Sequence, residues 1–141
     1  MKYILLLEEF IKQVPVVLEE FSKLPDLPLA LDLPQVMSNN FSFKIVDDKI
    51  VSNEISPNTL YDYAITDECE FLIGSQHYKM TNKSKKIKCS GELKIDDDGK
   101  ISFINNESGH YKPSKDLLKE VADIFKELNL LSEQAQIDYL Y

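Results

Sequence analysis

The chain divides at SGHYKPS (residues 108–114), which separates a β-rich middle region from an amphipathic C-terminal segment. Gly109 can adopt a positive φ in a tight turn, and Pro113 disfavours helical geometry at Lys112. Ser114 is a typical residue for the N-cap of a helix. The stretch therefore predicts a rigid turn that is followed directly by a helix.

His110 and Tyr111 lie on this predicted turn, and their residue types allow two interpretations. Two polar rings held in fixed directions can contact a ligand. They can equally lock the corner of the chain by hydrogen bonding to backbone carbonyls, which is the more common arrangement for polar groups that become buried. The sequence alone leaves both interpretations open.

Three pairs of strands are predicted before this turn, and each pair is joined by a short acidic turn. They comprise residues 41–46 with 49–51, 61–65 with 70–74, and 87–95 with 100–104. In the last pair, Gly99 can supply the positive φ that a tight turn needs. Asp96-Asp97-Asp98 lacks the alternating oxygen ligands and the distal glutamate of an EF-hand loop, so it predicts a turn and not a calcium site.

Two segments have the apolar periodicity of amphipathic helices. The first covers residues 3–24, in which Pro15 predicts either a kink or two short helices that meet near Gln13 and Val14. The second runs from about Lys115 to Asn129. Residues 137–141 favour a final strand over a short helical tail. Because no β-α-β alternation is present, we predict an α+β fold. Its mainly antiparallel sheet of about five to seven short strands would be packed by an N-terminal and a C-terminal helix.

The length of the chain and its apolar content set its domain organisation. A chain of 141 residues with 43% hydrophobic residues has the size and composition of one ordinary domain. We therefore expect a single domain over residues 1–141, in which residues 1–36 form the N-terminal helix and a proline-rich crossing segment. Residues 37–141 would form the β-rich core with the C-terminal helix. The apolar run near the N-terminus ends at Glu8, too early for a secretion signal or a membrane span.

The charge balance excludes several classes of function. All 16 basic residues are lysines, and the net charge of −8 argues against general nucleic-acid binding and against membrane binding. Chemistry that requires a bidentate guanidinium group is excluded because arginine is absent. Cys69 and Cys89 are too few and too widely spaced for a zinc site, so we predict no metal and no cofactor. Two free thiols are typical of a reducing compartment, which predicts a soluble cytoplasmic protein.

From Tyr61 to the C-terminus, the order of motifs resembles a module of the plant IQ-motif calmodulin-binding proteins and of uncharacterised fungal and bacterial relatives. In that module a histidine, a strand of small residues, a glycine turn and a Ser-Gly-His-Tyr-x-Pro signature follow one another. The corresponding residues here are His77, Ser90-Gly91-Glu92-Leu93, Gly99 and residues 108–113. All four glycines of the chain lie in the matching region.

The departures from the module limit what the resemblance implies. Tyr78 and Lys79 stand where the module has two serines after its first histidine. An IQ motif requires arginine and is absent, so calmodulin binding is not expected. The resemblance therefore implies a fold and a site rather than a reaction.

The predicted site is a pocket that forms if the two histidine-containing stretches face each other across the sheet. Its candidate binding residues are His77, Ser108, Gly109, His110, Tyr111 and Lys112. Possible anion contacts come from a lysine-rich stretch beside it, at Lys85, Lys86 and Lys88, because lysines act on phosphate as point charges. The simpler interpretation of these lysines is a solvated loop that balances an acidic chain.

The sequence predicts a function mainly by what it lacks. A histidine with a tyrosine can perform acid–base chemistry, but no acidic residue at a diagnostic spacing completes a catalytic dyad. We therefore expect a small soluble binding or regulatory domain for a protein partner or a phosphate-containing small molecule. The alternative is an enzyme acting on a nucleotide-like substrate of the ADP-ribose type. His77 or His110 would then be catalytic, and the chain would belong to a bacterial effector or a toxin-related protein.

Overall fold

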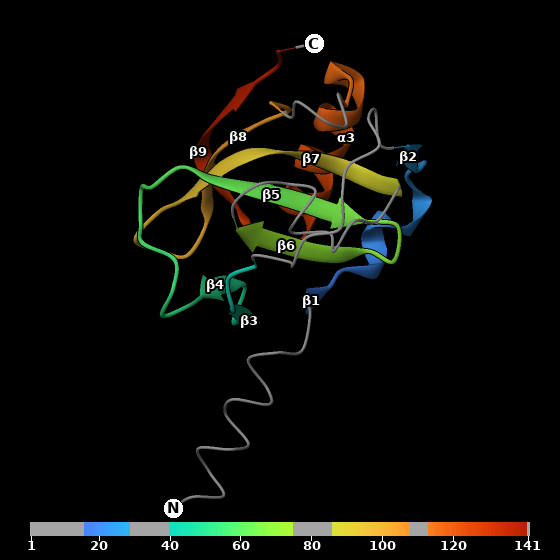
Figure 1. The fold of residues 1–141 in the computed structure, drawn as a ribbon. Coiled ribbons are helices and arrows are strands. Elements are labelled where there is room, and N and C mark those ends of the chain that lie inside the picture. The colour runs from blue at the N-terminus through green and yellow to red at the C-terminus, as the bar shows by residue number, and fades with distance from the viewer. Residues whose placement is uncertain (1–15, 29–39, 75–85, 108–112, 141) are drawn as a thin grey trace, which may run out of the picture.

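The computed structural model describes residues 16–28, 40–74, 86–107 and 113–140, and a seven-stranded sheet lies at its centre (Figure 1). The strands of this sheet are β1 (Val16–Val17), β2 (Leu27–Pro28), β5 (Tyr61–Thr66), β6 (Glu70–Gly74), β7 (Lys86–Ile95), β8 (Ile101–Asn105) and β9 (Leu131–Asp138). A separate two-stranded sheet consists of β3 (Lys44–Val46) and β4 (Lys49–Val51). The helical elements are the 3-10 helix η1 (Glu19–Lys23) and the α-helix α3 (Lys115–Glu127).

The order of the strands places β7 near the middle of the main sheet. The path runs β1-β6-β5-β7-β8-β9, and β2 pairs with β7 outside this path. Every pair is antiparallel except β8 with β9, which is parallel because α3 connects these two strands. The predicted α+β class and the mainly antiparallel sheet are therefore confirmed.

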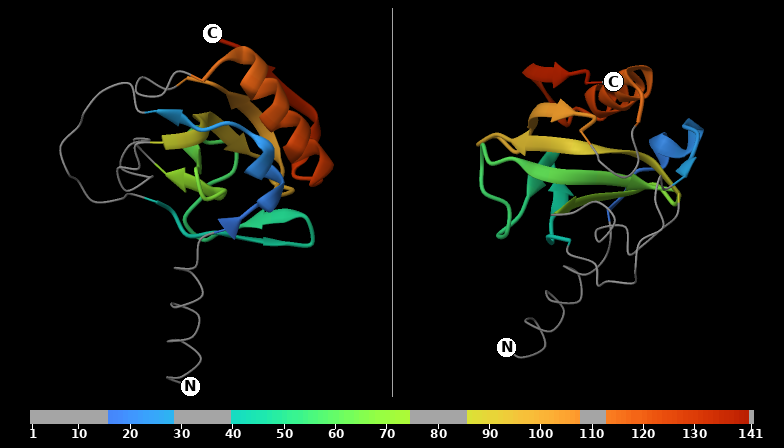
Figure 2. Two further views of the ribbon diagram at one scale, coloured as in Figure 1. Left: turned by 90° about the vertical axis from the view of Figure 1, so that its right-hand side faces the viewer. Right: turned by 45° about the horizontal axis from the view of Figure 1, so that its top comes forward.

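The hydrophobic core lies between one face of this sheet and α3 (Figure 2). Alternate residues of the central strands point toward it, among them Tyr63 and Phe71, which are fully buried. Phe125 of α3 packs against Phe71, with ring centroids 5.0 Å apart, and against Phe21 of η1, with centroids 5.1 Å apart. These rings join the N-terminal segment, the sheet and α3 in one core.

The predicted C-terminal helix is confirmed, and side-chain and backbone caps define both of its ends. The side chain of Ser114 accepts a hydrogen bond from the Leu117 amide at 3.1 Å, as an N-cap serine does. At the other end, Asn129 has a φ of 59°, and the Leu130 amide donates to the Phe125 carbonyl at 2.9 Å. This pattern is a Schellman motif, in which asparagine takes the left-handed position usually held by glycine.

The predicted N-terminal helix over residues 3–24 is wrong in its described part, since α3 is the only α-helix of the described residues. Val16 and Val17 form β1 and pair with β6, and the Leu18 amide donates to the Cys69 carbonyl at 2.9 Å. Proline at position 15 disfavours a regular helix there, and β-branched valines suit a strand. Residues 1–15 lie outside the described residues. The described helix is also not long and apolar enough to cross a membrane.

The predicted turns within the three strand pairs are confirmed, whereas the turn predicted at residues 108–112 lies outside the described residues. The C-terminal strand begins earlier than expected and ends at Asp138. Asp47 and Asp48 connect β3 to β4 with φ values of 51° and 60°, which match a two-residue hairpin turn. Gly99 has a φ of 75° in the turn between β7 and β8. The final strand, predicted at residues 137–141, is β9 and begins already at Leu131. It starts only one residue after the Schellman motif because the C-cap turns the chain back toward β8.

Candidate functional site

Most residues of the predicted site lie outside the described residues. This applies to His77 and Lys85 and to the turn residues Ser108, Gly109, His110, Tyr111 and Lys112. Lys86 is described by its backbone in β7, and Lys88 is described in full. The geometry of the site therefore rests on the residues that hold both ends of segment 108–112.

Strand β8, which leads into this segment, pairs with the same edge of β7 as β2 does. β8 pairs with β7 at Leu93 and Ile95, whereas β2 pairs with β7 at Ile87 and Lys86. Residues 88–92 lie between the two paired stretches, and β8 ends opposite them at Asn105. We call residues 88–92 and 105–107 together the open end of the β7–β8 hairpin.

Asn106 links the two ends of segment 108–112. Its side chain is fully buried, and its amide nitrogen donates a hydrogen bond to the Pro113 carbonyl at 3.0 Å. Its amide oxygen accepts a hydrogen bond from the Leu140 backbone at 2.8 Å. A buried amide with donor and acceptor both satisfied fixes the distance between the end of β8 and the start of α3. The described residues on either side of segment 108–112 are thus held at a fixed separation.

Asn105 organises the end of β8 through its side chain and its backbone. Its side-chain oxygen accepts hydrogen bonds from the amides of Glu92, at 2.7 Å, and Glu107, at 3.0 Å. Its backbone carbonyl accepts a hydrogen bond from the hydroxyl of Tyr63 at 2.8 Å. Asn105 is 5% exposed, and its bond with Tyr63 is buried, whereas its bonds with Glu92 and Glu107 are partly buried. They let the chain leave the regular strand ladder without unpaired buried groups.

Gly91 allows the close approach of the two strands at this point. A Cβ atom added at Gly91 would overlap the carbonyl oxygen of Asn105 and lie 2.8 Å from its carbonyl carbon. Both clashing atoms belong to backbone and cannot move aside as a side chain could. The open end therefore requires glycine at this position.

The sheet face next to Gly91 carries a hydroxyl and two carboxylates. Ser90 is fully buried opposite Ala64, and its hydroxyl has no hydrogen-bond partner in the part of the chain that the structure describes. Asp62 and Glu92 lie directly opposite each other on β5 and β7, and both are half-buried. A carboxylate oxygen of Glu92 accepts a hydrogen bond from the side-chain amide of Asn105 at 3.1 Å. The surroundings of the open end are thus polar and negatively charged.

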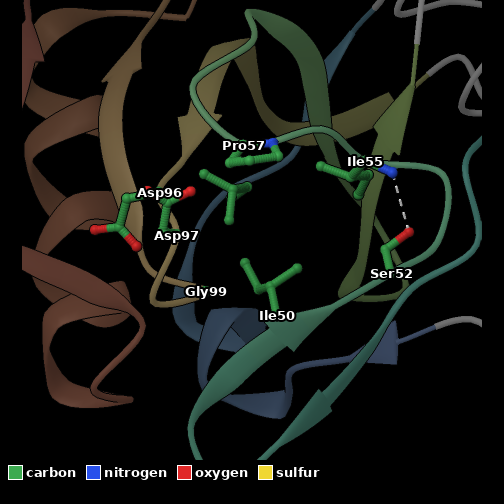
Figure 3. A pocket seen from close by; sticks show the side chains of 8 residues that line it. Ile50, Ser52, Ile55, Pro57, Asp96, Asp97 and Gly99 are labelled. Atoms are coloured by element: carbon green, nitrogen blue, oxygen red, sulfur yellow. Dashed lines mark hydrogen bonds between the residues drawn. The ribbon is translucent and has the colours of Figure 1, made fainter.

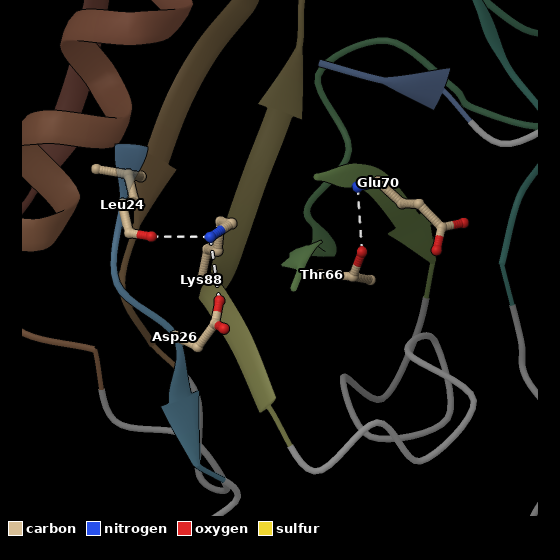
Figure 4. Close-up of polar contacts among 5 residues, drawn as sticks. All are labelled: Leu24, Asp26, Thr66, Glu70 and Lys88. Atoms are coloured by element: carbon tan, nitrogen blue, oxygen red, sulfur yellow. Dashed lines mark hydrogen bonds and ion pairs between the residues drawn. The ribbon is translucent and has the colours of Figure 1, made fainter. Parts of the chain in front are cut away.

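Lys88 does not have the geometry of a ligand contact (Figure 4). Its ammonium donates to the Leu24 carbonyl at 2.8 Å and to a carboxylate oxygen of Asp26 at 3.1 Å, and its side chain is only 7% exposed. The ion pair ties the N-terminal segment to β7. The anion contact expected at Lys88 is therefore not supported, because Asp26 already neutralises its charge.

A second polar contact in Figure 4 belongs to the turn between β5 and β6. The Glu70 amide donates to the Thr66 hydroxyl at 3.1 Å. Burial raises the pKa of the Glu70 carboxyl, the neighbouring Glu68 and Asp67 raise it further, and hydrogen bonding with Thr66 partly offsets this. Glu70 lies on the far side of β5 from β7, and its polar contacts stabilise this turn instead of the open end.

Neither cysteine has the properties of a nucleophile. Burial raises the pKa of the Cys89 thiol to about 12, although hydrogen bonds with Tyr63 and with the Ser90 backbone lower it in part. Burial also raises the pKa of Cys69. Both thiols are therefore protonated at neutral pH. Among the residues that the structure describes, no three His, Cys, Asp or Glu side chains are grouped so that they could hold a metal ion.

The sequence analysis missed the residues that frame the site, namely Asn105, Asn106 and Tyr63. A weak signal was present, because two asparagines directly follow a strand at a position where the chain must leave the sheet. Tyr63 carries no local signal, since its partner Asn105 is 42 residues away in sequence.

Comparisons of the chain with models of protein families, with curated proteins and with solved structures find no match. The resemblance to the Ser-Gly-His-Tyr-x-Pro module stays a prediction. The function is therefore argued from the geometry of the open end.

Proposed function

We propose that the protein is a small binding or regulatory domain whose partner contacts the turn at residues 108–112. One observation carries this proposal: Asn106 holds the Pro113 carbonyl at 3.0 Å across the turn from a fully buried position. A turn whose ends are fixed loses less conformational entropy when it binds than a free loop does. Polar rings on such a turn, here His110 and Tyr111, are suited to recognition.

The charge around the open end favours a protein partner over a phosphate-containing small molecule. Asp62 and Glu92 are carboxylates on the adjacent sheet face, and the charge of Lys88 is matched by Asp26. The carboxylate of Glu92 would repel a phosphate group bound beside it. A protein surface can instead present hydrogen-bond donors or a positive charge.

The alternative is an enzyme acting on a nucleotide-like substrate of the ADP-ribose type, and one observation favours it. Glu92 is a half-buried carboxylate that Asn105 holds at 3.1 Å, next to the strand end from which the chain leads to His110. A carboxylate near a histidine can orient the imidazole ring for general acid–base catalysis. In this alternative Glu92 is the acidic partner that the sequence spacing did not indicate.

A capture experiment with matched baits tests the binding proposal. Three baits are immobilised: the wild-type protein, His110→Ala and the control Lys119→Ala, whose substitution is exposed on α3. The proteins that each bait retains are quantified by mass spectrometry. We expect a partner that wild type and Lys119→Ala retain equally and that His110→Ala loses, with unchanged thermal unfolding of all three baits. Equal retention by all three baits would contradict the proposal.

A ligand screen separates the enzyme from the binding domain. Thermal unfolding is measured with nucleotides, NAD and ADP-ribose, since a ligand at a hundred times its dissociation constant adds about 2.7 kcal/mol to stability. The binding proposal predicts no shift and no turnover. If the protein turns over NAD or ADP-ribose and Glu92→Gln abolishes this turnover, the binding proposal is rejected in favour of the enzyme.

A further inference from the structure

A hollow of about 150 Å³ lies at the other end of the β7–β8 hairpin, between the β7–β8 turn and β4 with the loop that follows it (Figure 3). We call residues 95–100 the turn end. The apolar part of its wall comes from Ile50, Ile55, Pro57 and Ile95, of which Ile50 and Ile95 are buried, and Ser52 and Gly99 also line it. The carboxylate-bearing residues Asp96 and Asp97 complete the lining on the side of the turn. The hollow thus combines an apolar side, formed by isoleucines and a proline, with a polar and negatively charged side.

Backbone hydrogen bonds hold the walls of this hollow in place. The Ile50 amide donates to the Gly99 carbonyl at 2.9 Å, and the Asn58 amide donates to the Ile95 carbonyl at 2.7 Å. The Ile55 amide donates to the hydroxyl of Ser52 at 3.2 Å, which is the dashed line in Figure 3. The hollow is therefore formed without a ligand and needs no rearrangement to accept one.

The charges on the negatively charged side are only partly matched by protein groups. One carboxylate oxygen of Asp96 accepts from the backbone amides of Asp98, at 2.9 Å, and Lys100, at 3.0 Å. The ammonium of Lys100 donates to the carbonyls of Asp48 and Asn129 and not to a carboxylate of the turn. Asp97 forms no hydrogen bond or ion pair within the described part of the chain. Its carboxylate is available to a ligand, in a protein whose net charge of −8 attracts cations.

We propose that the hollow binds an alkylammonium group, with its hydrocarbon chain against the isoleucines and its nitrogen at Asp97. The apolar side excludes a fully hydrated metal ion, and the negatively charged side repels an anion. A cavity of about 150 Å³ can hold benzene, so it has room for a four-carbon chain with one nitrogen. The lysine side chain of a protein and a free aliphatic amine share this chemistry. This proposal does not depend on the proposed function, because that site lies at the opposite end of the hairpin.

A titration followed by two-dimensional NMR of the full chain tests this proposal. The probe is n-butylammonium chloride, compared with 1-butanol, which has the same number of non-hydrogen atoms and no charge, and with sodium chloride at equal ionic strength. We expect saturable shifts of the Ile50, Ile95 and Gly99 amides with the amine, and affinity for 1-butanol lower by about fivefold or more. Equal affinity for amine and alcohol, or no saturable shift, would overturn the proposal.

Two neighbouring substitutions assign the charge. Asp97→Asn should weaken binding of n-butylammonium by about fivefold, whereas Asp98→Asn, on the same turn but not lining the hollow, should leave it unchanged. If both substitutions weaken binding equally, the amine responds only to the total negative charge of the turn. That result would contradict a direct contact with Asp97. A final titration uses N-acetyl-lysine N-methylamide as the probe. If the protein binds this probe at least as tightly as n-butylammonium, the ligand is a lysine side chain. If it binds this probe more weakly, the ligand is a free amine.

Discussion

The two ends of the β7–β8 hairpin are held together by different kinds of interaction. At the turn end, the Gly99 amide donates to the Asp96 carbonyl at 3.1 Å, and the Asp96 amide donates to the Lys100 carbonyl at 2.8 Å. Every one of these groups lies within five consecutive residues. At the open end, the Asn105 carbonyl accepts from the Tyr63 hydroxyl, and the Asn106 side chain bonds to Pro113 and Leu140.

The difference shows where the stability of each end comes from. The turn end depends mainly on backbone hydrogen bonds, some within the turn and others from Ile50 and Asn58 of the neighbouring strand and loop. It is also partly exposed, so single side chains there should contribute little. The open end depends on buried polar groups brought together from distant parts of the chain, and the loss of one leaves its partner without a hydrogen bond. Substitutions at the open end should therefore cost more free energy of unfolding than matched substitutions at the turn end.

The largest effect is expected from the two glycines. Gly91→Ala places a Cβ atom against the backbone of Asn105 and should cost about 3 kcal/mol, because neither strand can move without breaking its pairing. In Gly99→Ala the alanine must adopt a positive φ, and its Cβ atom would lie 2.9 Å from the Cβ of Lys49 and 3.0 Å from the carbonyl oxygen of Ile50. These contacts are less close than those at Gly91, so the substitution should cost about 1–2 kcal/mol. Urea unfolding of both variants measures the difference. A larger loss for Gly99→Ala would reverse the comparison between the two ends.

The second effect concerns the side chain that spans segment 108–112. Asn106→Ala removes the partners of the Pro113 carbonyl and the Leu140 amide and should cost about 2–3 kcal/mol. Asn53→Ala, at an exposed position, should change stability by less than about 0.5 kcal/mol. Hydrogen exchange at the Leu140 amide should also become faster in Asn106→Ala. Unchanged exchange there would show that Asn106 does not hold the segment.

A third comparison uses two tyrosines of β5. Tyr63→Phe removes a fully buried hydrogen bond to Asn105 and should cost about 1–1.5 kcal/mol. Tyr61 accepts a hydrogen bond at 2.9 Å from the exposed Ser56 amide, and water can replace it, so Tyr61→Phe should cost less than about 0.5 kcal/mol. Thermal unfolding of the two variants measures these losses of stability. Equal losses would mean that burial does not distinguish the two ends.

The same contrast explains how much of the fold could be predicted from the sequence. The turn end was predicted correctly because its determinants, the acidic residues and Gly99, are adjacent in the chain. Helix α3 was predicted for the same reason, since its apolar periodicity and Ser114 are local. The N-terminal helix was wrong because the periodicity of residues 3–24 did not reveal that Val16 and Val17 pair with β6. Strand pairing between distant segments leaves no local signal.

The candidate site was predictable only in its location. Glycine, proline and serine predict a turn at residues 108–112, which lie outside the described residues. Asn105, Asn106 and Glu92 gain their importance from contacts that only the fold creates. Its place in a lysine-rich stretch made Lys88 a possible anion contact, with a solvated loop as the simpler interpretation. The fold instead buries it against Asp26, which is 62 residues away.

The smallest effect appears only at alkaline pH and again belongs to the open end. Burial raises the pKa of Cys89 to about 12, above its ordinary value of 9.0, so the unfolded thiol ionises before the folded one. Between these values the unfolded state binds fewer protons than the folded state, and stability must fall as the pH rises. Burial also raises the pKa of Tyr63 and of Cys69, so the wild type and Cys89→Ala should both lose some stability at high pH. At pH 10 the wild type should lose about 1 kcal/mol more than Cys89→Ala does. Urea unfolding of both proteins at pH 8 and at pH 10 isolates this contribution. Any packing cost of the substitution is the same at both pH values and cancels when each protein is compared with itself. An equal loss of stability in the two proteins would place the alkaline sensitivity elsewhere and remove Cys89 from the account of the open end.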